Sequence, residues 1–161
     1  MTDPHSCLIL DWNGVISTRV PGTADDRQVM PGAVESLSQL LRNHFPPQRV
    51  FIVSTSKRSP EATRQRFKQF DIQERVGIFP DHLFIVDTLD EKVAMARELG
   101  GTHAVDNDPK VLLKMSWMKV RVLFRPKIAV EEVLAIDRTI RPAFDWRAAQ
   151  SKLITDLCHS A

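Results

Sequence analysis

Asp11 ends a short apolar run that begins at Cys7, and Gly14 follows it closely. Such a run predicts a buried strand that delivers the carboxylate to the carboxyl edge of a sheet, where the ligands of open α/β folds bind. A buried carboxylate is costly unless it is paired or liganded. A carboxylate can also attack a phosphoryl group in line, which forms an aspartyl-phosphate and divides one difficult displacement into two easier ones. Asp11 is therefore placed for chemistry.

Three further groups of polar residues each follow a later apolar run. Positions behind parallel strands can converge in a doubly wound sheet although they lie far apart in the sequence. The groups are Ser54 and Thr55 behind residues 50–53, Lys92 early in the helix behind residues 83–86, and Asp106 and Asp108 behind residues 102–105. Each group alone is weak evidence, but together they predict one polar site at the carboxyl edge.

The elements that must position these residues alternate between strand and helix. Strands are expected at residues 7–10, 50–53, 83–86, 102–105 and 120–124, and helices at 31–45, 59–70, 88–99 and 109–117. This alternation is typical of βαβ units and a parallel sheet with all strand ends on one edge. Segment 17–30 is expected to be a flap over the site, and residues 129–160 to be two helices split near Pro142. We therefore expect one α/β domain over 1–161, a three-layer sandwich around a mainly parallel five-stranded sheet.

The composition limits the class of protein. The 161 residues include 22 basic and 20 acidic side chains, a formal charge of +2 that gives no strong field for nucleic acid or membrane. Arg64, Arg66 and Lys68 on one predicted helix are interpreted as its solvated face. Cys7 and Cys158 lie at opposite ends of the chain, so no disulfide is expected. With no basic leader and no long apolar segment, the expected location is cytoplasmic.

The order of these motifs resembles that of the haloacid-dehalogenase-like (HAD) hydrolases. In that family an apolar strand leads into Asp-x-Asp-Gly, a Ser or Thr follows the next strand, and a Lys and then an acidic pair come later. Residues 7–125 have the same order, with Asp11, Thr55, Lys92 and Asp106 at the matching places. The gaps between the motifs leave no room for a large inserted cap domain. The resemblance implies a Rossmann-like three-layer fold and hydrolysis of phosphate monoesters.

The resemblance also implies a role for each matching residue. Asp11 would be the nucleophile, while the hydroxyl of Thr55 and the ammonium of Lys92 would hold the phosphoryl oxygens as charge shifts in the transition state. Phosphoryl and carboxylate groups are both anionic, so a cation must bridge them. The implied cation is Mg²⁺, held by Asp11, the main-chain carbonyl of Asn13 and Asp106.

Several of these assignments have alternatives. Ser54 could supply the hydroxyl in place of the threonine, because strand ends are predicted only to within a residue or two. Lys57 is a rival ammonium group. Asp108 is the second-choice metal ligand, and its other interpretation is an ordinary helix N-cap. Trp12 is a candidate for binding substrate by stacking, and the simpler interpretation is that it packs beside the site.

Asn13 stands where the family has its second Asp. That Asp protonates the leaving oxygen and later activates water, which an amide cannot do, and losing such a group typically costs about 10²- to 10⁴-fold in rate. The favoured interpretation is a slow or specialised Mg²⁺-dependent phosphohydrolase. The alternatives are a binding or regulatory protein that holds phosphate and metal without efficient turnover, and an engineered replacement of a natural Asp. The expected partners are a phosphorylated substrate of unknown size and a second copy of the chain over the open edge; membrane and nucleic acid are not indicated.

Overall fold

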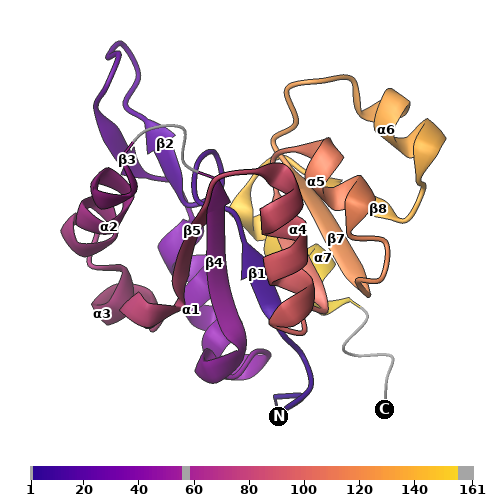
Figure 1. The fold of residues 1–161 in the computed structure, drawn as a ribbon, viewed down its shortest axis with the longest axis horizontal. Coiled ribbons are helices and arrows are strands. Elements are labelled where there is room, and N and C mark those ends of the chain that lie inside the picture. Colours follow the sequence, from indigo (N-terminus) through magenta and orange to yellow (C-terminus); the bar gives the residue numbers. More distant parts are fainter. Residues whose placement is uncertain (1, 56–58, 156–161) are drawn as a thin grey trace.

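The structure is a computed structural model that describes residues 2–55 and 59–155. Six parallel strands form a central sheet in the order β5-β4-β1-β6-β7-β8 (Figure 1). They are β1 (Leu8–Leu10), β4 (Val50–Thr55), β5 (Leu83–Val86), β6 (His103–Asp106), β7 (Val120–Phe124) and β8 (Ile140–Ala143). The expected α/β sandwich with a mainly parallel sheet is confirmed, with one strand more than predicted.

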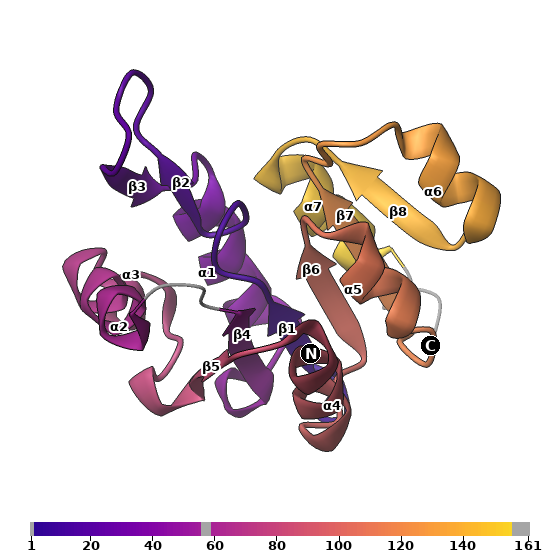
Figure 2. The same ribbon diagram turned by 45° about the horizontal axis from the view of Figure 1, so that its top comes forward.

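Helices cover both faces of this sheet. Figures 1 and 2 show α4 and α5 on one side and α1 and α7 on the other. The helices are α1 (Ala33–Asn43), α2 (Pro60–Gln69), α3 (Ile72–Val76), α4 (Leu89–Glu98), α5 (Pro109–Lys114), α6 (Val130–Ile136) and α7 (Trp146–Ile154). Short 3-10 helices at Pro47–Arg49 and Pro80–His82 lead into β4 and β5.

The strands are apolar on both faces, as parallel strands between two helical layers must be. Leu8 and Leu10 of β1 belong to the core cluster beneath α1 and α7, whereas Cys7 and Ile9 belong to the cluster beneath α4, α5 and α6. This alternation follows from the two-residue repeat of a strand. Trp146 of α7 is fully buried, and its indole nitrogen donates to the main-chain oxygen of Val15 at 2.8 Å, which ties the last helix to the loop behind β1.

One sequence prediction about secondary structure was wrong. The chain beyond residue 129 forms α6, β8 and α7, and Pro142 lies inside β8 instead of separating two helices. A proline fits there because β8 is the outermost strand, so its missing N–H leaves no neighbouring strand unpaired. The segment expected as a flap contains an antiparallel hairpin of β2 (Ser17–Arg19) and β3 (Arg27–Val29).

Cys7 is buried and free, and burial raises the pKa of its thiol to about 11. Cys158 lies outside the described residues. Among the helices that the structure describes, none combines the length and the apolar character needed to cross a bilayer.

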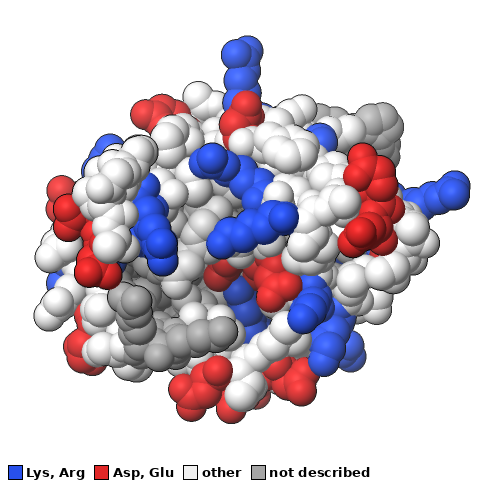
Figure 3. Space-filling view, turned by 90° about the horizontal axis from the view of Figure 1, so that it is seen from above, with Lys and Arg blue, Asp and Glu red and all other residues white. Residues whose placement is uncertain are grey.

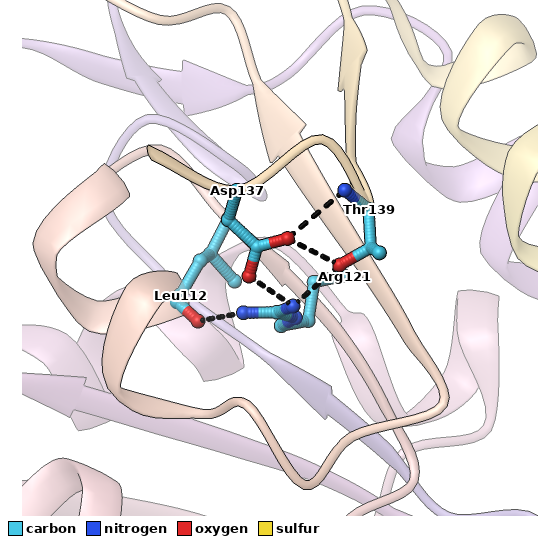
Figure 4. A network of polar contacts seen from close by, with 4 residues as sticks. All are labelled: Leu112, Arg121, Asp137 and Thr139. Carbon is cyan, nitrogen blue, oxygen red and sulfur yellow. Dashed lines mark hydrogen bonds and ion pairs between the residues drawn. The ribbon is translucent and has the colours of Figure 1, made fainter. Parts of the chain in front are cut away.

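A buried arginine joins β7 to the turn before β8 (Figure 4). The guanidinium of Arg121 donates to the main-chain oxygen of Leu112 at 2.8 Å, to Oδ2 of Asp137 at 2.6 Å and to Oγ1 of Thr139 at 2.7 Å. Hydrogen bonds from the hydroxyl and main-chain N–H of Thr139, followed by one from Arg121, lower the pKa of Asp137 to about 2. The network fixes the added strand to the rest of the sheet.

Replacing Asp137 by Ala is expected to lower the free energy of unfolding by about 1–3 kcal/mol, because buried Arg121 then lacks its carboxylate partner. The exposed fraction of Asp137, 23%, keeps this value modest. An aspartate whose folded pKa is depressed stabilises the fold above its unfolded pKa of about 4, and this contribution is lost as pH falls towards 2. Urea unfolding of both proteins should therefore give a difference that is full at pH 6 and shrinks below pH 4. A difference that does not vary with pH would contradict the ion pair.

Candidate functional site

Asp11 and Asp106 meet because their strands are neighbours in register. In the β1·β6 pair, Leu10 lies opposite Val105, so the next residues along the two strands are Asp11 and Asp106. The main-chain N–H of Asp11 donates to the oxygen of Val105 at 3.0 Å and continues the ladder to this point. The next connection from β1 leads to β4 on one side, and the chain later returns to β6 on the other. The carboxyl end of β1 is thus the switch point, where open α/β sheets bind ligands.

Lys92 reaches both carboxylates from the first turn of α4. Its Nζ lies 2.8 Å from Oδ1 of Asp11 and 2.7 Å from Oδ2 of Asp106. Thr88 fixes the start of this helix, since its hydroxyl accepts the N–H of Glu91 at 3.1 Å. The predicted ammonium and two of the predicted carboxylates therefore lie within a few ångströms of one another, from three segments far apart in the sequence.

The three charged groups are buried together, with exposed fractions of 7% for Asp11, 3% for Lys92 and 3% for Asp106. Burial by itself lowers the pKa of Lys92, but the charges of Asp11 and Asp106 outweigh it, so that pKa lies above its usual value. Burial, and then the charge of Asp11, raise the pKa of Asp106 against the opposing effect of Lys92. The raised pKa of Asp106 reflects burial and two adjacent carboxylates that share one ammonium, so a further cation would favour the ionised form of both.

Replacing Lys92 by Met is expected to lower the free energy of unfolding by about 3–5 kcal/mol, because two buried carboxylates lose their shared counter-ion. Lys114→Met is the matched control. Lys114 pairs with Asp90 at 2.7 Å, but these side chains are 55% and 82% exposed, and an exposed pair contributes at most about 1 kcal/mol. Urea unfolding at pH 7 measures both variants. Equal losses would contradict a strongly coupled buried cluster.

A cleft of about 650 Å³ opens above this cluster at the carboxyl edge. Figure 3 looks onto that edge and shows acidic side chains in a hollow with Lys and Arg side chains around it. Thr55, the last residue of β4, lines the cleft. Ser54 is fully buried, its hydroxyl has no hydrogen-bond partner, and it is not among the residues that line the cleft. Of the two candidate hydroxyls, the geometry favours Thr55.

Asn13 is an exposed residue of the cleft, held by the hairpin. Its Oδ1 accepts a hydrogen bond from Nη2 of Arg27 at 3.0 Å. Gly14 behind it has φ +80°, and a Cβ there would lie 2.2 Å from Nδ2 of Asn107. Only glycine combines that conformation with so close an approach. The loops behind β1 and β6 are therefore in direct contact at the floor of the cleft.

The other predicted site residues are Trp12, Asp108 and Lys57. The side chain of Trp12 is 1% exposed and packs on Phe67 and Phe70, with ring centroids 6.3 and 5.9 Å away, so of its two interpretations the geometry favours packing beside the site over stacking on substrate. Asp108 lines the cleft and is also the N-cap of α5, since its Oδ1 accepts the N–H of Lys110 at 2.9 Å. Lys57 lies outside the described residues.

Four basic residues of the cleft were not predicted. Arg66 of α2 was interpreted as part of a solvated face, and the flap was given no side-chain role. The sequence held a signal for two of them, because Arg19 and Arg27 lie within segment 17–30, which was expected to cover the site. The residues are Arg19 and Arg27 of the hairpin, Arg66, and Lys127 behind β7.

The oxygen ligands that Asp11 and Asp106 offer are of the kind that Mg²⁺ prefers. This ion prefers oxygen ligands, usually keeps several waters, and is bound by one or two carboxylates together with substrate phosphates. Asp11 and Asp106 supply two adjacent carboxylates that share one ammonium group. In residues 2–55 and 59–155 no group of three or more His, Cys, Asp or Glu side chains is suited to hold a metal ion, so a cage made of protein side chains alone is not found there. The residues present fit an ion that keeps waters.

Comparisons with protein-family models and with curated proteins found no relative of this chain. No protein-family model matches the sequence, and no curated protein matches it closely enough to count as related.

Proposed function

We propose that the protein is a Mg²⁺-dependent phosphohydrolase that acts on a phosphate monoester through an aspartyl-phosphate at Asp11. One observation carries the proposal: the Nζ of Lys92 lies within 2.8 Å of both Asp11 and Asp106, in a buried cluster at the floor of a cleft. Buried charges are costly unless they are paired or liganded, and a phosphoryl-transfer site needs this combination of nucleophile and cations. The resemblance of the motif order to the HAD hydrolases supports the same function.

Each residue has a stated role in this proposal. Asp11 attacks the phosphorus and forms the phosphoenzyme as the P–O ester bond breaks and the leaving group departs as its oxyanion, and water then hydrolyses the phosphoenzyme to release phosphate. Lys92 and the hydroxyl of Thr55 hold the phosphoryl oxygens as negative charge shifts onto them. Asp11, Asp106 and the main-chain carbonyl of Asn13 would hold Mg²⁺, with Asp108 as a further candidate. The ion supplies positive charge between the two anionic partners.

Asn13 limits the chemistry that follows. Its carboxamide neither donates a proton to the leaving oxygen nor removes one from water, and Arg27 engages its oxygen. The first step then depends on a good leaving group, and the second on a water activated by another group. Aryl phosphates, whose leaving groups need no proton, are the substrates expected to react fastest.

The hydrogen bond from Arg27 to Asn13 also favours a second candidate function. A protein that recognises phosphate and Mg²⁺ without turnover needs the carboxylates and Lys92 but has no use for an acid at position 13. The hydrogen bond from Arg27 at 3.0 Å gives Asn13 a structural role that such a protein would retain.

An assay with p-nitrophenyl phosphate, in Mg²⁺ or in EDTA, separates the two. The hydrolase predicts turnover in Mg²⁺ that EDTA abolishes. The binding protein predicts that BeF₃⁻ with Mg²⁺ raises the melting temperature while no ester is hydrolysed. Neither turnover nor a thermal shift would reject both functions.

A further inference from the structure

The outer part of the cleft carries positive charge that the proposed chemistry does not use. Arg19 and Arg27 come from the hairpin and Arg66 from α2, and all three line the cleft. Within the described ranges, the ion pairs of the protein involve Lys92, Lys114 and Arg121, and none of these three arginines has a carboxylate at ion-pair distance.

Neutral acceptors hold two of these arginines in place without cancelling their charge. Arg27 donates to the hydroxyl and the main-chain oxygen of Ser17 at 3.0 and 2.9 Å, and to Asn13. Arg66 donates to the main-chain oxygen of Asp25 at 3.3 Å. Burial, and then the charges of Arg66 and Arg19, lower the pKa of Arg27. The positive charges of these three arginines therefore lie close together at a cost in free energy, which a bound anion would offset.

A second cavity, of about 350 Å³, adjoins the cleft at this point. Its lining consists of Asp26, Arg27, Ala62, Gln65, Arg66 and Gln69. Arg27, Ala62 and Arg66 line both cavities, so the two guanidinium groups stand between the cleft and the adjacent hollow. Two glutamine amides and two guanidinium groups against one carboxylate suit an anionic group that accepts several hydrogen bonds.

The part of the cleft lining that the structure describes offers no exposed aromatic ring for stacking on a nucleobase. Among the described residues that line it, Trp12 is the single aromatic one, and its ring is buried against Phe67 and Phe70. Stacking on exposed aromatic faces is a main contribution to the binding of bases, at about 1–3 kcal/mol per base. A ligand of this cleft is therefore selected by its phosphates.

We propose that the substrate is a phosphate monoester that carries a second phosphate on a non-aromatic scaffold, with Arg27 and Arg66 binding the second phosphate. The inference rests on the proposed function for the position of the first phosphate, beside Asp11 and Lys92. Phosphate and guanidinium pair through two parallel hydrogen bonds, which gives Arg66 a role that a surface arginine lacks.

Isothermal titration calorimetry in Mg²⁺, with the Asp11→Asn protein to prevent turnover, tests this inference. The probes are glucose 1,6-bisphosphate against glucose 6-phosphate, and adenosine 3′,5′-bisphosphate against adenosine 5′-phosphate. Each bisphosphate is expected to bind about ten- to a hundredfold more tightly than its monophosphate. Adding Arg66→Gln should remove most of this preference. Arg64→Gln, at an exposed position of the same helix outside the cleft, should leave it intact.

Two results would overturn the inference: equal binding of bisphosphate and monophosphate, or a preference that survives Arg66→Gln. Much tighter binding of the adenosine pair than of the glucose pair would overturn the non-aromatic scaffold. If Arg66→Gln does not fold, Arg66→Lys replaces it; this variant keeps the charge but loses the paired hydrogen bonds, and it should weaken the preference. A bisphosphate preference in a wild-type protein that hydrolyses no ester would leave this inference standing and reject the hydrolase. Hydrolysis of an ester by a protein without the bisphosphate preference would support the hydrolase and reject this inference.

Discussion

Replacement of Asp11 by Asn is expected to reduce Mg²⁺-dependent hydrolysis of p-nitrophenyl phosphate by about 10⁴-fold or more, to the uncatalysed rate. The carboxamide has nearly the shape of the carboxylate, and its oxygen can still accept the hydrogen bond from Lys92. It is not a nucleophile, so no phosphoenzyme forms. Acid quenching after incubation with a ³²P-labelled ester should label the wild-type protein and leave the variant unlabelled.

The fold should survive this change, which makes the loss of rate interpretable. Removing one of two buried carboxylates leaves Lys92 and Asp106 as a neutral pair at 2.7 Å, so the melting temperature should not fall. Asp90→Asn is the control, because Asp90 is an exposed carboxylate whose partner is Lys114. Turnover that persists in Asp11→Asn would rule out Asp11 as the nucleophile.

Asn13→Asp is expected to raise the hydrolysis of aryl phosphates by about 10²- to 10⁴-fold, because a carboxylate at this position can activate water against the phosphoenzyme. The contact with Arg27, 3.0 Å in the present structure, would become an ion pair that keeps the new carboxylate ionised. An ionised group serves as a base but not as an acid. The gain for alkyl phosphates, whose leaving oxygen needs a proton, should therefore be much smaller.

Steady-state rates for phenyl and ethyl phosphate, in the single variant and in Asn13→Asp/Arg27→Gln, check this prediction. Without the arginine the carboxyl group can hold a proton at neutral pH, and the alkyl ester should gain relative to the aryl ester. Arg27→Gln alone reports the cost of the lost contacts with Ser17. Equal gains for both esters would show that Arg27 does not set the protonation state. No gain for either would show that another group performs the proton transfers or that the site does not hydrolyse esters.

The sheet could be predicted because its signals are local. Each buried parallel strand is a short apolar run, and polar residues follow it at the edge where ligands bind. The side chains of Asp11 and Asp106 then converge through a pairing, Leu10 with Val105, that the strand order imposes. The position of Lys92 near the start of its helix could be predicted from Thr88, the N-cap residue that sets where the helix begins.

The features that were missed depend on contacts between segments distant in the sequence. Arg66 is one of several basic residues on its helix, and it differs from Arg64 only because the hairpin lies against its side. The strand around Pro142 is tolerated because nothing pairs with its outer edge, which the sequence of that strand does not reveal. For Trp12 the sequence left packing and stacking both open, and only the contacts with Phe67 and Phe70 from a distant helix and turn favour packing.

The bond from Trp146 to Val15 has a consequence for any attempt to trim the chain. A fragment that stopped after β7 would keep every motif residue, but the segment between Asp11 and the hairpin would lose its anchor and α1 its neighbour α7. The C-terminal stretch without chemical motifs therefore supports the segment that carries Asp11, so a fragment that keeps this segment in place must be longer than the part that carries the motifs.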